Sequence, residues 1–476
     1  MHQHKITHSP ANGKVNKTVK IALINPPIPE GVFRHQPYLP IGLAYLAAVL
    51  ERNSHEVKIL DCPTLRINCE QLKKEIADFD PEVAGITSMT PTINSAFAAA
   101  QAVKEVKSDA TVVIGGPHAT FMAEQILRDV ADIDIVVRGE GEQTITEVAQ
   151  KKANREKLRD VAGITFRKNG EIIRTAERKY IENLDELPYP SLGHFSLENY
   201  RVFGRKIFPV ITSRGCPFQC SFCITSRVFG KKTRMRTAES VVNELEWLKN
   251  EHDAEAYSFF DDTFTLDKQR VNKICDEIIA RKINVPWDCQ TRVDQITPEI
   301  LSKMKKAGCE IVTFGIEAGC QRILDSIHKK TSVEQNQHGI RMVKKAGLSV
   351  VTSVIIGFPG ENLDTIKETL QFVQRLKPDD AYVCIATPYP GTDLYRLVKE
   401  NGWEMSPDWS KYDTVTPVFE NPLISNDDLL MMRKKFYNDF YSPSYILRQM
   451  IKGKFYNRIL YRTALNHFIW RMKAAL

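Results

Sequence analysis

The 476-residue chain is long enough for two or three domains, and its 43% hydrophobic and 26% charged residues are typical of a folded globular protein. This composition excludes a largely disordered chain, a collagen and a polytopic membrane protein. The net charge of +7, from 65 basic and 58 acidic residues, is too small at this length to indicate nucleic-acid binding by itself.

Residues 1–18 are polar and lack apolar periodicity, so they are predicted to form a flexible tail. This end has no apolar signal-peptide core, and the longest apolar runs, such as Ile41 to Leu50, reach about half the length of a bilayer span. We therefore expect a cytoplasmic protein. In that reducing compartment, a local cluster among the ten cysteines would bind metal or do chemistry.

Residues 19–150 alternate between strand-like apolar runs and helix-length segments. The predicted strands are 19–25, 56–61, 82–88, 111–116 and 134–139. Five strand–helix units with short connections predict a doubly wound, Rossmann-like α/β domain that binds ligands at the carboxyl ends of its strands. The candidate binding residues at these ends are Asn25, Pro26, Gly115, Gly116, His118, Gly139 and Glu140.

The first strand leads into NPPIPEG, and no G-x-G-x-x-G opens the next helix, which disfavours a nicotinamide cofactor. The segments NPP, LPIGLAYLAAVLE, VKILD, GGPHAT and RGEGE instead resemble the cobalamin-binding domain of cobalamin-dependent radical S-adenosylmethionine (SAM) enzymes. The resemblance implies that residues 19–150 bind cobalamin. The D-x-H-x-x-G motif of other cobalamin proteins is absent, which suggests that no protein histidine binds the cobalt. The alternative interpretation of GGPH is a tight turn that needs glycine, so His118 is disfavoured as a cobalt ligand.

Residues 151–200 are predicted to connect two domains. The segment AGITFRKNGEIIRT predicts a hairpin that turns at Asn169-Gly170, and the proline-rich NLDELPYPSLGHF predicts a loop.

Three cysteines follow this connector in the pattern C-x-x-x-C-x-x-C: Cys216, Cys220 and Cys223. This spacing places three thiolates on one tight loop, within reach of one small cluster, and three ligands leave one iron of a 4Fe-4S cube open. A structural zinc site would normally recruit four ligands, and no second C-x-x-C or nearby histidine pair follows. Each remaining cysteine fits a small buried residue better than a ligand, although Cys289 and Cys384 fall on predicted strands.

The segment closely resembles the radical SAM superfamily, in which the open iron chelates SAM and one electron cleaves it to a 5'-deoxyadenosyl radical. Strand-like runs at 256–260, 285–290, 309–315, 349–358 and 380–386 alternate with amphipathic helices. This predicts a partial (β/α)6 barrel over residues 201–400, with its chemistry at the carboxyl ends of the strands. The resemblance implies that Phe222 packs near adenine, that Asp262, Arg292 and Glu317 contact SAM, and that the segment around Gly357 lies along the adenine. Asp262 and Glu317 could instead cap the next helix.

The two predicted domains together suit chemistry at an unactivated carbon. The first hypothesis is radical C-methylation, with cobalamin as the methyl donor. The second is an anaerobic oxidative cyclase or ring-forming enzyme acting on a lipid or tetrapyrrole, similar to the magnesium-protoporphyrin monomethyl ester cyclases. A non-catalytic cobalamin sensor or carrier is disfavoured because it needs no open iron, and a tRNA methylthiotransferase because its usual N-terminal cysteine cluster is missing.

Residues 401–476 are predicted to form a helical C-terminal segment. After Ser442 it carries cations among aromatic and aliphatic residues, and no acidic residue. This pattern suits peripheral contact with an anionic membrane, or helices that pack over the barrel with a solvated face; nucleic acid is a lesser alternative. The expected partners are a ferredoxin or flavodoxin as reductant and a small-molecule or lipid substrate.

Overall fold

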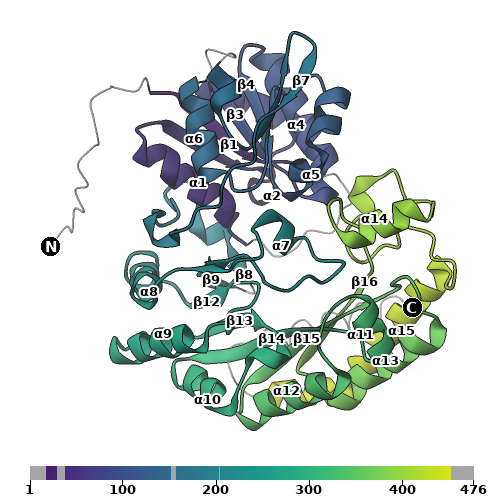
Figure 1. Ribbon diagram of the computed structural model, residues 1–476. Coiled ribbons are helices and arrows are strands. Elements are labelled where there is room, and N and C mark those ends of the chain that lie inside the picture. The colour runs from purple at the N-terminus through teal and green to yellow at the C-terminus, as the bar shows by residue number, and fades with distance from the viewer. Residues whose placement is uncertain (1–17, 29–37, 152–156, 203, 452–476) are drawn as a thin grey trace.

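The computed structural model describes residues 18–28, 38–151, 157–202 and 204–451, and two seven-stranded sheets organise them (Figure 1). The predicted tail lies almost entirely outside the described residues, and so does most of the basic C-terminal stretch. Among the described residues, no helix is long and apolar enough to cross a membrane.

The first sheet has the strand order β2-β1-β3-β4-β5-β6-β7, which confirms the predicted doubly wound architecture. Its strands are β1 (Lys20–Asn25), β2 (Glu56–Asp61), β3 (Val83–Thr87), β4 (Thr111–Gly115), β5 (Ile135–Val137), β6 (Ile164–Lys168) and β7 (Glu171–Arg174). The helices around it are α1 (Ile41–Arg52), α2 (Cys62–Leu65), α3 (Cys69–Phe79), α4 (Ile93–Val106), α5 (Pro117–Asp129) and α6 (Glu142–Lys151). The strands from β1 to β5 pair in parallel, and the chain reverses direction across the sheet between β1 and β3. Ligands bind beside such a reversal.

The hairpin predicted in the connector forms, but it extends the first sheet. Strand β6 pairs antiparallel with β5, and β7 pairs with β6. Asn169 and Gly170 at its turn both have left-handed backbone conformations, with φ of 49° and 82°. A two-residue turn of this kind matches the twist of the paired strands.

The second sheet, in the order β16-β15-β14-β13-β12-β9-β8, forms the predicted partial barrel, whose neighbouring strands run parallel except for β8. Its strands are β8 (Arg201–Val202), β9 (Arg205–Val210), β12 (Ala256–Phe259), β13 (Trp287–Thr291), β14 (Cys309–Glu317), β15 (Ser349–Ile356) and β16 (Asp380–Ile385). The accompanying helices are α7 (Thr225–Val228), α8 (Ala238–His252), α9 (Lys268–Ala280), α10 (Pro298–Lys306), α11 (Gln321–Ser326), α12 (Val333–Lys345), α13 (Leu363–Leu376) and α14 (Asp393–Glu400). A short pair, β10 (Ser213–Arg214) and β11 (Arg234–Met235), leads into and out of the cysteine loop.

Polar side chains at the ends of the loops cap the N-termini of the barrel helices. The side chains of Thr237, Asp267 and Thr297 accept backbone N–H groups at the starts of α8, α9 and α10. Asn362 does the same for α13 as part of a capping box. Each such cap contributes about 1 kcal/mol, so the sequence fixes where the strand-end loops stop.

Helix α15 (Asn426–Phe440) packs along β16, and α16 (Pro443–Ile451) lies at the start of that strand. The Tyr441 hydroxyl donates to Asp380 Oδ1 at 2.6 Å, and Gln449 Nε2 donates to the Asp379 carbonyl at 3.0 Å. The segment between α14 and α15 returns to the first domain, where Trp409 meets the His118 ring edge-on at 5.0 Å.

Candidate active site

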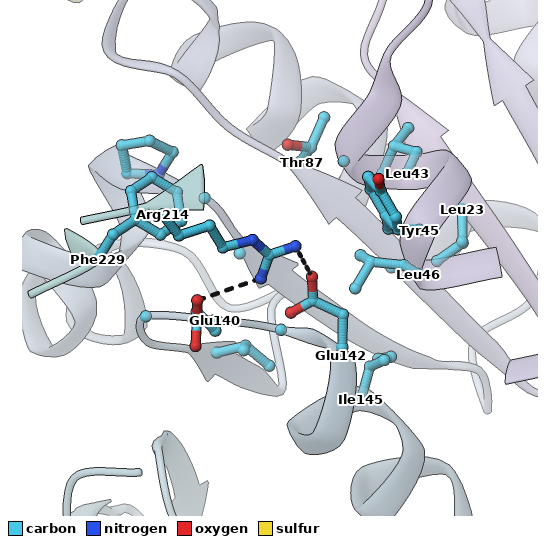
Figure 2. Close-up of a pocket in the computed structure, with 18 of the residues that line it drawn as sticks. Leu23, Leu43, Tyr45, Leu46, Thr87, Glu140, Glu142, Ile145, Arg214 and Phe229 are labelled. Atoms are coloured by element: carbon cyan, nitrogen blue, oxygen red, sulfur yellow. Dashed lines mark hydrogen bonds and ion pairs between the residues drawn. The ribbon is translucent and has the colours of Figure 1, made fainter. Parts of the chain in front are cut away.

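A cavity of about 310 Å³ lies at the carboxyl ends of the first sheet's parallel strands (Figure 2). Both halves of the chain build its walls, which are mainly apolar. Leu23, Leu43 and Tyr45 come from the first domain, whereas Ile211 and Phe229 come from the segments around the cysteine loop. A small-molecule site is therefore formed where the two sheets meet.

Glycines keep the first domain's side of this cavity open. The Gly116 backbone has a φ of 106°, and a Cβ there would lie 2.4 Å from the Ser88 carbonyl oxygen. A Cβ at Gly42 or Gly139 would meet no atom within 4 Å, because both residues border open space. The glycine-lined strand ends can thus approach a broad ligand closely.

Buried charges cross from one domain to the other beside the cavity. Arg214 on β10 donates to Glu140 Oε1 at 3.1 Å and to Glu142 Oε1 at 2.6 Å, and Figure 2 draws both contacts. The guanidinium also lies 5.8 Å from the centre of the Tyr45 ring. Burial opposes the charge of Arg214, but the two carboxylates outweigh burial and raise its pKa.

The three candidate cluster ligands, Cys216, Cys220 and Cys223, lie on the loop between β10 and α7, and all are half-buried. The loop turns sharply at Gly215, which has a φ of 90° and where a Cβ would lie 2.6 Å from the Lys232 carbonyl oxygen. Burial raises the pKa of the Cys220 thiol to about 11. A bound metal would have to supply the charge that keeps this group a thiolate.

Within the described ranges, no three His, Cys, Asp or Glu side chains lie close enough to hold a single metal ion. The corners of an iron–sulfur cube lie farther apart than the ligands of one ion.

A second set of buried charges packs against the cysteine loop. Glu317 ends β14 with a left-handed φ of 58°, and its carboxylate accepts a hydrogen bond from Lys329 Nζ at 2.8 Å. Arg292, at the end of β13, pairs with Asp294 through two 3.0 Å contacts and stacks on the Phe218 ring at 3.6 Å. The candidate residues Arg292 and Glu317 thus both lie beside the loop.

Asp262 occupies the position between the cavity and the cysteine loop. It borders the cavity, and its Oδ1 accepts the Thr225 hydroxyl at 2.9 Å from α7. Asp262 is exposed to solvent, but desolvation by the protein atoms around its carboxyl raises the pKa of Asp262 to about 6.

The candidate residue Phe222 lies on the cysteine loop itself and packs against Phe358, the neighbour of the candidate residue Gly357. The Phe222 and Phe358 ring centres are 5.5 Å apart, and Gly357 N donates to Glu361 at 2.6 Å. Burial raises the pKa of Glu361 to about 7.

The cavity brings together Gly115, Gly116, Gly139, Glu140 and Asp262, five of the residues singled out from the sequence. Asn25, Pro26 and His118 do not line it. The Asn25 amide donates to Asp61 at 2.7 Å and so joins β1 to β2.

The His118 ring is turned away from the cavity lining. Its Nδ1 is 3.1 Å from the Thr90 hydroxyl, and its edge meets Trp409. Burial lowers the pKa of His118 to about 4, so the ring is neutral near pH 7.

Four charged residues of the site were not among the sequence-based candidates: Glu142, Arg214, Arg234 and Lys329. Glu142 stands in the RGEGE segment, and Arg214 directly precedes the cysteine loop, so both were visible as neighbours of motifs. Lys329 carries no comparable signal, because it lies in a loop between α11 and α12.

Comparison with known proteins identifies the chain. Residues 210–373 match the radical SAM superfamily, and residues 34–149 match the B12-binding domain. An uncharacterized methyltransferase of Pyrococcus horikoshii is 35% identical, over 92% of this chain and 95% of that relative. The chain belongs to the cobalamin-dependent radical SAM enzymes.

Other members of this family differ in the reactions they are named for. An anaerobic magnesium-protoporphyrin IX monomethyl ester cyclase of Rubrivivax gelatinosus is 32% identical, over 84% of this chain and 73% of that relative. The structure of TsrM from Kitasatospora setae, a radical SAM methyltransferase with cobalamin and a 4Fe-4S cluster bound, has a TM-score of 0.74 at 17% identity. The alignment of the two structures covers 94% of this chain and 99% of the TsrM chain, which shows a common fold.

The cofactors expected from the sequence are confirmed: this enzyme uses a 4Fe-4S cluster, SAM and cobalamin. It requires a reductant and acts on a small-molecule substrate. The chain fits these groups, because three thiols share one loop and the glycine-lined cavity opens at the strand ends of the B12-binding domain.

Proposed function

We propose that this enzyme is a radical C-methyltransferase. The observation that supports this most is the cavity at the B12-binding domain, because the segments flanking the cysteine loop form part of its wall. When bound, the cluster and SAM supply a carbon-centred radical, and cobalamin supplies the methyl group. Both cofactors would then face one space, as transfer to a substrate radical requires.

In this proposal, Cys216, Cys220 and Cys223 hold the cluster. Gly115, Gly116 and Gly139 let the backbone approach cobalamin, and Glu140 anchors that wall to the barrel. The whole cofactor is larger than the cavity, so part of it would lie outside the enclosed volume.

The residues around the cysteine loop would bind SAM. Asp262 is an acceptor for its amino group, and Gly357 and Phe222 form a surface for adenine. Glu317 and Arg292 are further polar contacts for SAM. Lys329 holds Glu317 in place, and Asp294 holds Arg292.

The cobalt would have no protein imidazole among its ligands. His118 is the histidine near these strand ends that the sequence singled out, and it is buried against Thr90 and Trp409. Binding cobalt would require it to give up both contacts.

Methyl transfer from SAM is the direct test of this function. Protein reconstituted under anaerobic conditions with the cluster and cobalamin would be incubated with trideuteriomethyl-SAM, dithionite and a small-molecule and lipid extract. We expect 5'-deoxyadenosine and methionine from the SAM that is cleaved, S-adenosylhomocysteine from a second SAM that gives up its methyl group, and a product that carries the intact trideuteriomethyl group. Replacing dithionite with reduced ferredoxin or flavodoxin tests the proposed electron donors.

The same experiment separates the alternatives. A cyclase, which the Rubrivivax relative favours, would form 5'-deoxyadenosine and an altered substrate without deuterium. A cobalamin carrier would cleave no SAM. Either result would contradict the methyltransferase proposal.

We further propose that the protein is cytoplasmic and reaches a lipid substrate at the membrane surface. The cations and aromatic residues after Ser442 support this, since each cation near an anionic surface adds about 1 kcal/mol of attraction. Full-length protein should co-sediment with anionic vesicles in a salt-sensitive way, and removal of residues 452–476 should abolish this. Equal, negligible sedimentation of the two forms would exclude membrane contact.

A further inference from the structure

Four buried charged side chains join the two domains beside the cavity. Glu140 follows β5 and Glu142 begins α6, whereas Arg214 lies on β10 and Arg234 on β11. Arg234 Nη1 lies 2.9 Å from both Glu140 carboxylate oxygens. Glu140 therefore binds both guanidinium groups, and Glu142 binds Arg214 alone.

Backbone groups of the connector complete this cluster of charges. Glu140 Oε2 accepts the Ile181 N–H at 2.9 Å, and Arg234 donates to the Ile181 carbonyl at 2.8 Å. The Arg234 guanidinium also lies 4.9 Å from the centre of the Tyr180 ring. Three parts of the chain, distant in sequence, are thereby held in one arrangement.

This cluster of charges restricts how the two domains can be positioned relative to each other. Buried ions are tolerated only where their partners are closely placed, so any displacement of one domain would leave a charge unpaired. Charge-assisted contacts of guanidinium groups to carboxylates are also directional.

The cluster of charges touches both proposed cofactor sites. Arg214 precedes Cys216 by two residues, and Cys216 N donates to the Gly230 carbonyl at 3.1 Å. Glu140 and Glu142 line the cavity on the B12-binding side (Figure 2). One set of contacts therefore links the cavity wall to the cysteine loop.

We propose that Glu140, Glu142, Arg214 and Arg234 are positioning residues that fix the separation between bound cobalamin and the iron–sulfur cluster. The inference rests on the proposed function, which places cobalamin in the cavity that Glu140, Glu142 and Arg214 line and the iron–sulfur cluster on the loop that begins two residues after Arg214. A separation fixed in this way matters because a misplacement of about 1 Å can cost about a hundredfold in rate.

The test measures this separation in the holoenzyme without a substrate. Dithionite reduction gives a paramagnetic cluster and cob(II)alamin, whose magnetic dipolar interaction reports the distance between them. The variants are Arg234→Gln and Arg234→Met, because Arg234 does not line the cavity and is not part of the cysteine loop. The matched control is Arg201→Gln, which removes a half-buried arginine paired with Glu198 of the connector and Glu255 of the barrel, away from the cavity.

We expect wild type and the control to show one well-defined dipolar splitting. Both test variants should keep their iron content and bind cobalamin, but their splitting should shift or broaden. Arg234→Lys keeps the positive charge and one donor direction, so it should broaden the splitting less. If circular dichroism shows that Arg234→Gln is misfolded, Arg234→Lys is measured in its place.

The outcomes separate this inference from the proposed function. If wild type holds both cofactors and the folded variants keep its splitting, the ion cluster serves only stability and the inference is overturned. If wild type binds neither cofactor, the proposed function falls and this inference falls with it.

Discussion

Replacing Cys216, Cys220 and Cys223 together by alanine is expected to remove the iron–sulfur cluster and all reductive cleavage of SAM. The loop offers three thiols and no fourth cysteine, so the triple variant retains no ligand set for a cube. Iron and sulfide analysis, the visible absorption of the reconstituted protein and chromatography for 5'-deoxyadenosine measure this loss.

The matched control is Cys69→Ala, because Cys69 is also half-buried but lies at the start of α3 in the B12-binding domain. It should keep the wild-type iron content and 5'-deoxyadenosine yield. A triple variant that still binds the cluster and forms 5'-deoxyadenosine would show that the ligands lie elsewhere in the chain.

Replacing Gly42 by leucine should weaken cobalamin binding by about tenfold or more, which corresponds to about 1.4 kcal/mol. A Cβ at this position meets no atom within 4 Å and points into space bordering the cavity, so the larger side chain would occupy room needed by the cofactor. Gly42 stands inside α1, where leucine is a better helix former, so the fold should not suffer. Equilibrium dialysis with hydroxocobalamin measures the affinity.

Gly193→Leu is the control for this substitution. A Cβ at Gly193 also meets no atom within 4 Å, but the residue lies in the connector and does not line the cavity. Wild-type affinity is expected for this variant. Equal affinities of the two variants would argue that cobalamin binds away from the cavity.

The sequence predicted the fold well because its signals are local. Apolar runs such as 19–25 and 349–358 identify buried parallel strands by length and composition. The Asn169-Gly170 dipeptide predicts its hairpin for an equally local reason, the preference for left-handed backbone. Whether that hairpin joins a sheet depends on the exposed edge of β5, which no local pattern encodes.

The candidate site was predicted less completely for the same reason. Glycines and cysteines can be recognised from short sequence motifs. Three of the glycines found in this way, Gly115, Gly116 and Gly139, line the cavity. Arg214 and Glu142 are 72 residues apart in sequence, and their contact depends on how the two domains dock. The hydrophobic periodicity of the sequence therefore cannot predict this ion pair. His118 illustrates the opposite case: its motif suggested a binding loop, but packing against Trp409 turned its side chain elsewhere.

One contiguous apolar cluster extends from Leu23 and Leu43 in the first domain through Leu192 of the connector to Val210 and Trp287 in the barrel. Domains that share so much apolar contact do not unfold separately, because melting one exposes the other's buried surface to water. The two halves should therefore denature in a single cooperative transition. A fragment ending near residue 150 would keep its own second apolar core, from Ala22 to Val136, but would expose the face that the barrel covers, so the B12-binding half owes part of its stability to the barrel that follows it in the chain.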